Sequence, residues 1–435
     1  MNRNVLLVEH RAKGKARKNL ALARYSTLYK SKGDNVLHVV IDSKFKYPQG
    51  FKPDLVYISI IFSWDIPYIK RFVDELRFIF PHLNKPGSII LGGVCTGYLK
   101  EYIQQNIGIE PVVGCDYNLD HVVPDFSFFK DTDESFLFSG RGCTNKCLPH
   151  CVVPKIEPEI YEISNWREQI DYSKKITVFM DNNILCQPHK NELFKFLESF
   201  APVSNNFVEG SRKIREVRFD SGFDWRLLNE ENCYLISRIR HNQIRLAFDN
   251  VKFEAGFDEG ITRLLKFFPK VSSRELHENF SCYVLYNNDK VDTIEDALYR
   301  AYKLLYHYRV RPFLMRYIPC DSLYYKKYVS PQWQKEDAID IGRFFNHRSV
   351  IFKVPRYLYY VGRDQDEKCI NQFSSLKGIE NFLSNMSLPD IDYTKSFSYN
   401  LKKIKGELDM RNEAMATVRE KLRQYYQPQI FELIT

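Results

Sequence analysis

Short apolar runs alternate with helical patterns in the first part of this chain of 435 residues. Buried parallel strands appear in a sequence as near-continuous hydrophobic segments. The expected strands are Val5–Val8, Asn35–Ile41, Pro53–Ile60 and Ser88–Gly93, and the expected helices are Leu20–Tyr29 and Pro67–Phe80. This alternation predicts an α/β fold in which residues 1–132 form a Rossmann-like domain with an open, doubly wound parallel sheet.

The same alternation restarts at residue 136. The six expected strands are Phe136–Ser139, Lys175–Met180, Glu216–Phe219, Gln243–Phe248, Ser281–Tyr286 and Arg311–Ile318. The expected helices between them are Trp166–Tyr172, His189–Phe200, Trp225–Arg238, one within Gly260–Phe268, and Ile294–Tyr308. A repeated βα unit indicates a parallel barrel, so we predict a partial (β/α)6 barrel over residues 133–330. The alternation then stops, and residues 331–435 are expected to form a mainly helical C-terminal segment.

Three cysteines lie within nine residues, directly after the first of these strands. They are Cys143, Cys147 and Cys151, spaced C-x3-C-x3-C. Cysteine thiolates bind the irons of iron–sulfur clusters, and three of them leave one iron of a four-iron cluster without a protein ligand. With His150, the same cysteines could instead form a structural zinc site. A disulfide framework is the weakest alternative, since no signal peptide is seen and intracellular thiols stay reduced.

Composition excludes some classes of protein and leaves others open. The other seven cysteines are scattered and are expected to be free thiols. No run of eighteen apolar residues occurs, so no membrane span is expected. We expect a cytoplasmic protein. The net charge of +9 permits a nucleic-acid partner without requiring one. Aromatic and basic residues within 356–363 could stack on bases, but a buried packing surface is the better explanation of them.

The cysteine loop resembles that of the radical S-adenosylmethionine (SAM) superfamily. The flanks Gly140–Cys143 and Cys151–Pro154 are similar to those of members with an N-terminal cobalamin-binding-like domain, and to those of the methylthiotransferases. The usual spacing in the superfamily is C-x3-C-x2-C, with an aromatic residue before the third cysteine. This chain has one more residue there, and His150 in the aromatic position.

This resemblance implies cofactors and a reaction. A [4Fe–4S] cluster on the three cysteines would bind SAM and cleave it reductively, with electrons from a flavodoxin- or ferredoxin-type protein. Residues 1–125 resemble a cobalamin-binding domain, although the D-x-H-x-x-G motif is absent and His10, His38 and His121 do not fit it. Methyl transfer to an unactivated carbon is the leading outcome, and sulfur insertion or another radical reaction is the alternative. A non-catalytic, zinc-stabilised binding module is the hypothesis from another class.

Polar residues follow several of the expected barrel strands, where α/β barrels carry their chemistry. By resemblance, Asp181 falls where the superfamily contacts the amino group of SAM. Candidates for ribose or carboxylate contacts are Arg218, Asp220, Arg245 and Asp249. Glu157 is a candidate for a contact to SAM or to the loop. The alternative is that these side chains cap helices or form ion pairs within the barrel.

Overall fold

The computed structural model describes residues 2–341, apart from 11–18, 43–44, 46, 146, 148–150, 204–214, 270, 272–275, 277–278, 289–291, 324–326, 334, 336–337 and 339–340. The chain divides into two compact units. The first comprises Met1–Arg245, Gly260–Phe268 and Ile318–Tyr328, and the second comprises Leu246–Glu259, Pro269–Tyr317 and Val329–Thr435. The domain boundaries expected after residues 132 and 330 stay predictions.

A four-stranded parallel sheet lies in the first unit, with the strand order β2-β1-β3-β4. Its strands are β1 (Asn4–His10), β2 (Asn35–Ile41), β3 (Leu55–Ser59) and β4 (Ile89–Gly92). The sequence predicts all four of them to within three residues at either end. The central strand β1 is buried along nearly its whole length, as a strand covered on both faces should be.

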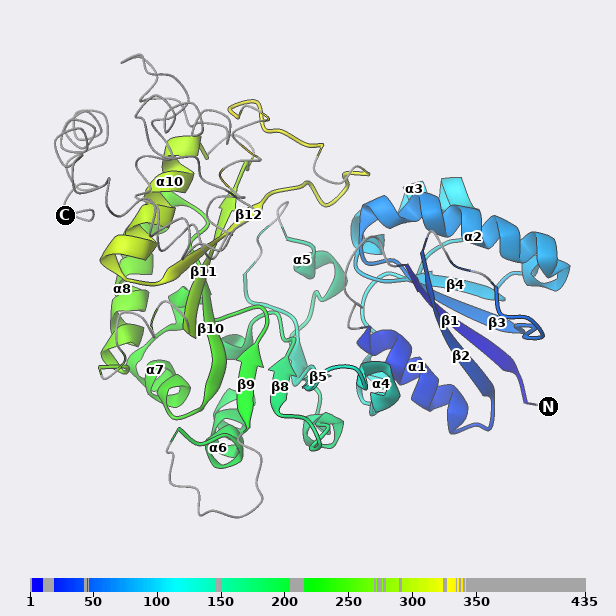
Figure 1. The fold of residues 1–435 in the computed structure, drawn as a ribbon, viewed down its shortest axis with the longest axis horizontal. Helices are drawn as coiled ribbons and strands as arrows, with labels where there is room; N and C mark the ends of the chain where they lie inside the picture. The colour runs from blue at the N-terminus through cyan, green and yellow to red at the C-terminus, as the bar shows by residue number, and fades with distance from the viewer. Residues whose placement is uncertain are drawn as a thin grey trace, which may run out of the picture. The chain divides into compact units, whose positions relative to one another are not determined.

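Helices cover both faces of this sheet (Figure 1). They are α1 (Leu20–Lys30), α2 (Ile66–Ile79) and α3 (Thr96–Ile107). Leu6 and Val8 of β1 pack in one apolar cluster with α2 and α3, whereas Val5 and Leu7 pack in another with α1. Successive strand residues point to opposite faces, so the apolar run of β1 fixes helices on both sides.

A six-stranded sheet has the order β12-β11-β10-β9-β8-β5. Its strands are β5 (Glu134–Leu137), β8 (Ile176–Phe179), β9 (Glu216–Phe219), β10 (His241–Ala247), β11 (Phe280–Tyr286) and β12 (Arg311–Arg316). The pairs β5–β8, β8–β9, β9–β10 and β11–β12 are parallel. A mixed α/β fold with parallel sheets is therefore confirmed, while closure into a partial barrel stays a prediction.

The connections contain the helices α6 (Lys190–Phe200), α7 (Glu230–Ser237), α8 (Glu254–Lys266) and α10 (Ile294–Tyr302). Thr293 and Asp296 form a reciprocal capping box at the start of α10. The helix expected at Trp166–Tyr172 was wrong, because only the 3-10 turn η4 (Trp166–Gln169) forms there. There the Trp166 ring is fully buried, so packing holds this segment rather than helical hydrogen bonds.

Small elements lie in the chain between β4 and β5, which connects the two sheets, or follow β5. They are α4 (Tyr117–Asp120), η3 (Phe126–Phe129), β6 (Gly140–Arg141), α5 (Val153–Ile156) and β7 (Tyr161–Glu162). Residues 342–435, including Cys369 and the aromatic and basic stretch 356–363, lie outside the described residues. Among the helices that are described, none has the length and apolar character needed to cross a membrane.

Candidate cofactor site

The cysteine loop leaves the second sheet through a short antiparallel ribbon. β6 and β7 pair with Gly140 opposite Glu162 and Arg141 opposite Tyr161. Gly142 then turns the chain with a φ of +84°, and a Cβ there would lie 2.3 Å from the carbonyl oxygen of Glu159. Only glycine fits this close approach, so Gly142 sets the direction in which the loop starts.

The three cysteines follow this turn. The backbone N–H of Cys151 donates to the carbonyl of Cys147 at 2.9 Å, a helix-like i to i+4 bond that the three-residue spacing allows. Cys143 and Cys151 are half-buried and Cys147 is exposed. Lys146 and residues 148–150 lie outside the described residues, so the alternative of His150 as a zinc ligand is left open.

The surroundings of Cys143 favour the thiolate that a metal requires. Hydrogen bonding from the Cys186 thiol, set against burial, lowers the pKa of Cys143 to about 6. The backbone N–H of Asn145 also donates to Cys143 Sγ at 3.3 Å, and Asn183 Nδ2 donates at 3.6 Å. A sulfur surrounded by donors in this way is a fitting ligand for iron.

Cys151 differs from Cys143. Burial raises the pKa of Cys151 to about 11, and the neighbouring charges of Cys147 and Cys143 add to the effect. Like charges that repel one another are neutralised when they share a cation, so this donor set fits a metal cluster. As the loop stands, no three His, Cys, Asp or Glu side chains in the described part of the chain are gathered closely enough to hold a metal ion.

Glu157 holds the base of the loop. Its side chain is 3% exposed, and its Oε2 accepts from the backbone N–H of Gly142 at 2.8 Å and from Asn182 Nδ2 at 2.7 Å. Its Oε1 accepts from Arg141 at 3.0 Å and from the Cys115 thiol at 3.7 Å. Glu157 was expected to contact either SAM or the loop, and in the structure it contacts the loop.

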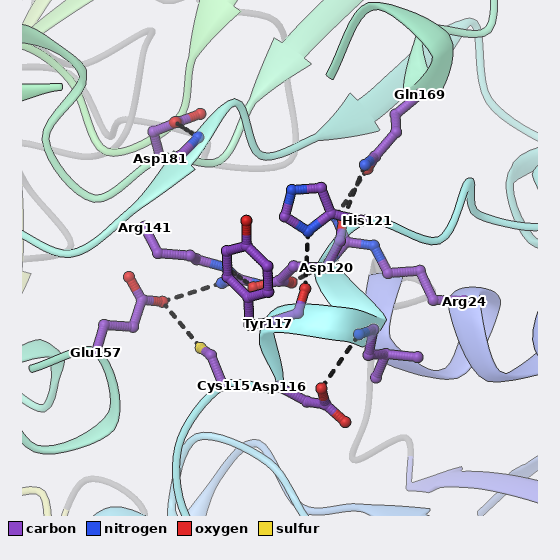
Figure 2. A network of polar contacts seen from close by, with 12 residues as sticks. Arg24, Cys115, Asp116, Tyr117, Asp120, His121, Arg141, Glu157, Gln169 and Asp181 are labelled. Atoms are coloured by element: carbon purple, nitrogen blue, oxygen red, sulfur yellow. Dashed lines mark hydrogen bonds and ion pairs between the residues drawn. The ribbon is translucent and has the colours of Figure 1, made fainter. Parts of the chain in front are cut away.

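A buried ion-pair network continues from Arg141 (Figure 2). Asp120 accepts from Arg141 at 2.9 and 2.6 Å, from Tyr161 at 2.7 Å and also from Arg24 of α1. Burial lowers the pKa of the Arg141 guanidinium, but the charge and hydrogen bonds of Asp120 have the larger combined effect, so the pKa is raised. The network therefore ties the first helix of the chain to the start of the cysteine loop.

Asp181 lies directly beyond β8 and faces the same loop. Its Oδ1 accepts from Ser139 Oγ at 2.8 Å and from the backbone N–H of Gly140 at 2.7 Å. The Ser139 N–H lies 3.1 Å from each carboxylate oxygen. Burial raises the pKa of Asp181 to about 6, although these hydrogen bonds oppose the shift. In this arrangement the carboxylate anchors the strand end, and its contact to SAM stays a prediction.

The other candidates form ion pairs or backbone contacts. Arg218 pairs with Glu134 at 2.5 Å and with Asp220 at 2.8 Å, and Arg245 pairs with Asp220 at 3.0 Å. These three side chains are brought together within the first unit and remain 11% to 28% exposed. Asp249 belongs to the second unit, where it accepts from the backbone N–H of Leu285. Their roles as SAM ligands stay predictions.

Several residues around the loop carry no signal in the sequence. Asp120 accepts from both Arg141 and Arg24, and Asp224 accepts from Asn145 at 2.5 Å and from Asn183 at 3.1 Å. The Asp120 and Asp224 side chains lie in loops or short turns without hydrophobic periodicity. Arg141 lies in the Gly-Arg-Gly-Cys flank, but nothing in the sequence identifies its partners.

Comparison with known proteins supports the fold and the resemblance. No protein-family model matches the sequence, and no curated protein matches it. Among solved structures, the chain is similar to the radical SAM methyltransferase TsrM from Kitasatospora setae with cobalamin and a [4Fe–4S] cluster bound. The TM-score is 0.54 at 13% identity, over 72% of this chain and 75% of TsrM.

A second structure of TsrM, with tryptophan substrate and the SAM analogue aza-SAM bound, matches with a TM-score of 0.56 at 12% identity. The match covers 73% of each chain. At such low identity the likeness shows a shared fold. The resemblance to the radical SAM superfamily, predicted from the cysteine motif, is thereby confirmed at the level of the fold.

Proposed function

We propose that this protein is a radical SAM enzyme that holds a [4Fe–4S] cluster on Cys143, Cys147 and Cys151. The observation that carries the proposal is the position of these thiols. They lie on a glycine-turned loop after the first strand of a parallel sheet, in a chain with the fold of TsrM. When bound, the cluster supplies the electron that cleaves SAM.

The residues of the chain prepare and orient this site. Asn145 and Asn183 donate to Cys143 and keep its sulfur available as a thiolate. Glu157 and Asp181 bind backbone N–H groups on either side of Arg141 and so fix where the loop begins. Positioning of this kind matters because misplaced ligands and reacting atoms lower the rate steeply.

We further propose that the reaction is cobalamin-dependent methyl transfer. The first sheet is an open parallel sheet with helices on both faces, and such sheets bind cofactors at the carboxyl ends of their strands. TsrM, whose fold is similar over 72% of this chain, has been solved with cobalamin bound. When bound, cobalamin supplies the methyl group that is transferred.

Single Cys→Ala variants test the cluster assignment. We expect Cys143→Ala, Cys147→Ala and Cys151→Ala each to abolish 5′-deoxyadenosine formation from SAM under anaerobic reduction. Cys233→Ala is the matched control, because Cys233 is buried in α7 and packs there as an ordinary free thiol. SAM cleavage that persists in all three loop variants would contradict the assignment.

A further inference from the structure

Asp181 is a buried acid that borders the cysteine loop. Its carboxylate accepts hydrogen bonds from the backbone N–H groups of Ser139 and Gly140. Two residues further along the chain, Asn183 donates to the sulfur of Cys143 at 3.6 Å. Because Asp181 is only 2% exposed, a proton on its carboxyl group reaches solvent through other side chains.

Ser139 and His189 lie in a row with this carboxylate. Ser139 Oγ is 2.8 Å from Asp181 Oδ1, and His189 Nε2 is 3.0 Å from Ser139 Oγ. His189 is the N-cap residue of α6, yet its side chain makes no capping hydrogen bond. Helix capping therefore does not explain why the imidazole ring is buried against Ser139.

The second nitrogen of the ring connects this row to the surface. His189 Nδ1 is buried and has no hydrogen-bond partner among the described residues. Glu162 Oε2 lies 4.0 Å from it, and the Glu162 side chain is 36% exposed. A carboxylate only accepts hydrogen bonds, so its charge favours the tautomer with the proton on Nδ1. Nε2 then has the lone pair and accepts from the Ser139 hydroxyl group, whose single proton can turn to either neighbour.

The ionisation of the two end groups suits proton transfer. Burial raises the pKa of Asp181 to about 6 and lowers the pKa of His189 to about 4. Arg167 and Glu192 are the other charged groups that act on the His189 ring, and they pair with each other at 2.5 Å. At neutral pH the carboxyl group is mostly ionised and the ring is neutral, so each can accept a proton and pass it on.

We infer that Asp181, Ser139 and His189 form a proton path from the SAM site to the protein surface. An amino group binds iron through its lone pair, and an α-amino group has a pKa of about 8, so the ammonium form of SAM has to lose a proton first. That N–H bond breaks and the proton passes to Asp181.

The proton then leaves by transfer along the row. Asp181 gives a proton to Ser139 Oγ while this hydroxyl group gives its own proton to His189 Nε2, and Nδ1 releases a proton towards Glu162 and water. One proton leaves, and the carboxylate and the neutral ring are restored. The inference rests on the proposed function and on the SAM contact predicted for Asp181, and it adds the route by which the site loses a proton.

Proton release on SAM binding tests the path in the full-length, cluster-loaded protein. Without a reductant, SAM binds and is not cleaved. In an anaerobic stopped-flow experiment, a pH indicator in weakly buffered solution reports the proton, and the visible absorption of the cluster reports binding. For the wild type at about pH 7 we expect about one proton per SAM bound, released as fast as SAM binds.

Two variants interrupt the path and keep Asp181. In His189→Gln the amide keeps a donor for Ser139 but does not relay protons, and Ser139→Ala keeps the backbone N–H bonds to Asp181. In both we expect the same number of protons, released about 100-fold more slowly than SAM binds, as for loss of a positioned acid or base. His241→Gln is the matched control, because burial also lowers the pKa of His241 to about 4 but its ring binds the carbonyl of Ile236.

The results that would overturn the inference differ in what they leave standing. Proton release that keeps pace with SAM binding in both His189→Gln and Ser139→Ala would exclude the path and leave the proposed function intact. SAM binding to the wild type without proton release would exclude it as well. Failure of the cluster-loaded wild type to bind SAM would overturn the proposed function and the inference together.

Discussion

Glu157 is the residue on which the polar contacts of the cysteine loop converge. Its carboxylate accepts from the backbone of Gly142, from Asn182 and from Arg141, and it is almost fully buried. A glutamine at this position would have one accepting oxygen and one donating NH₂ group. The NH₂ group would face at least one of these donors, which would then lose its acceptor. Leaving a buried partner unsatisfied costs about 1–3 kcal/mol.

Glu157→Gln should therefore lower the free energy of unfolding by about 2 kcal/mol and reduce the iron bound after reconstitution. Urea unfolding and iron analysis measure the two effects. Glu159→Gln is the control, because Glu159 is exposed on the same segment and exposed substitutions usually change stability by less than about 0.5 kcal/mol. Equal stability and iron content in both variants would show that Glu157 does not hold the loop.

Gly142 permits a comparison in which backbone strain is kept constant. Gly142 and Gly87 have nearly equal positive φ values of +84° and +82°. A Cβ added at Gly142 would lie 2.3 Å from the carbonyl oxygen of Glu159, whereas a Cβ added at Gly87 would have no atom within 4 Å. We expect Gly142→Ala to destabilise the protein by about 1–3 kcal/mol more than Gly87→Ala, because only the first adds a steric clash. Equal losses by thermal or urea unfolding would argue that φ alone matters.

At the scale of single residues, the sequence indicates candidate ligands, which stay predictions, but it does not indicate the residues that support the loop. The cysteines, Glu157 and Asp181 lie in one motif or directly after an apolar strand, so chain position indicates them. The partners of Arg141 cannot be found in this way. Asp120 is 21 residues from Arg141 and 96 from Arg24, and these contacts arise only once the chain has folded.

At the scale of elements, Asp125 joins η3 to α1. Its Oδ2 accepts from Ser26 and Lys30 of α1, both within 2.7 Å, and its Oδ1 caps η3 through the Ser127 N–H. Burial opposes charge on this carboxyl, but the hydrogen bonds from Lys30, Ser127 and Ser26 lower its pKa to about 2.

Because this pKa is lower in the folded than in the unfolded chain, the carboxylate stabilises the fold above about pH 4. That stabilisation is lost as the pH falls toward 2. Asp125→Asn should remove about 1–2 kcal/mol at neutral pH and flatten the change of stability between pH 4 and 2. Urea unfolding across this pH range measures both effects, and Asp131→Asn, at an exposed position, is the control. Parallel pH profiles of stability for wild type and Asp125→Asn would contradict the prediction.

Element prediction succeeded where hydrophobic patterning is strong. The expected bounds of β2 and β9 match the structure, because their apolar runs end at polar residues or turns. Prediction failed where packing replaces periodicity, as at η4, whose tryptophan is held by the Phe179 and Phe196 rings. The two-residue ribbon β6–β7 is too short to leave any periodic signal.

At the scale of the whole molecule, two stretches of βα alternation correspond to two parallel sheets. The sequence predicted both sheets, because each strand is an apolar run of its own. The likeness to TsrM extends over about 72% of the chain, so it includes more than the neighbourhood of the cysteine motif. The proposed function therefore depends on one claim, that the loop holds an iron–sulfur cluster that cleaves SAM.

That claim is tested most directly by anaerobic reconstitution of the full-length protein, followed by iron, sulfide and zinc analysis and a 5′-deoxyadenosine assay with dithionite and SAM. We predict about four irons and four sulfides per chain, as a [4Fe–4S] cluster requires, together with 5′-deoxyadenosine. A colourless protein that contains zinc, lacks sulfide and leaves SAM intact would contradict the account and identify the loop as a structural zinc site.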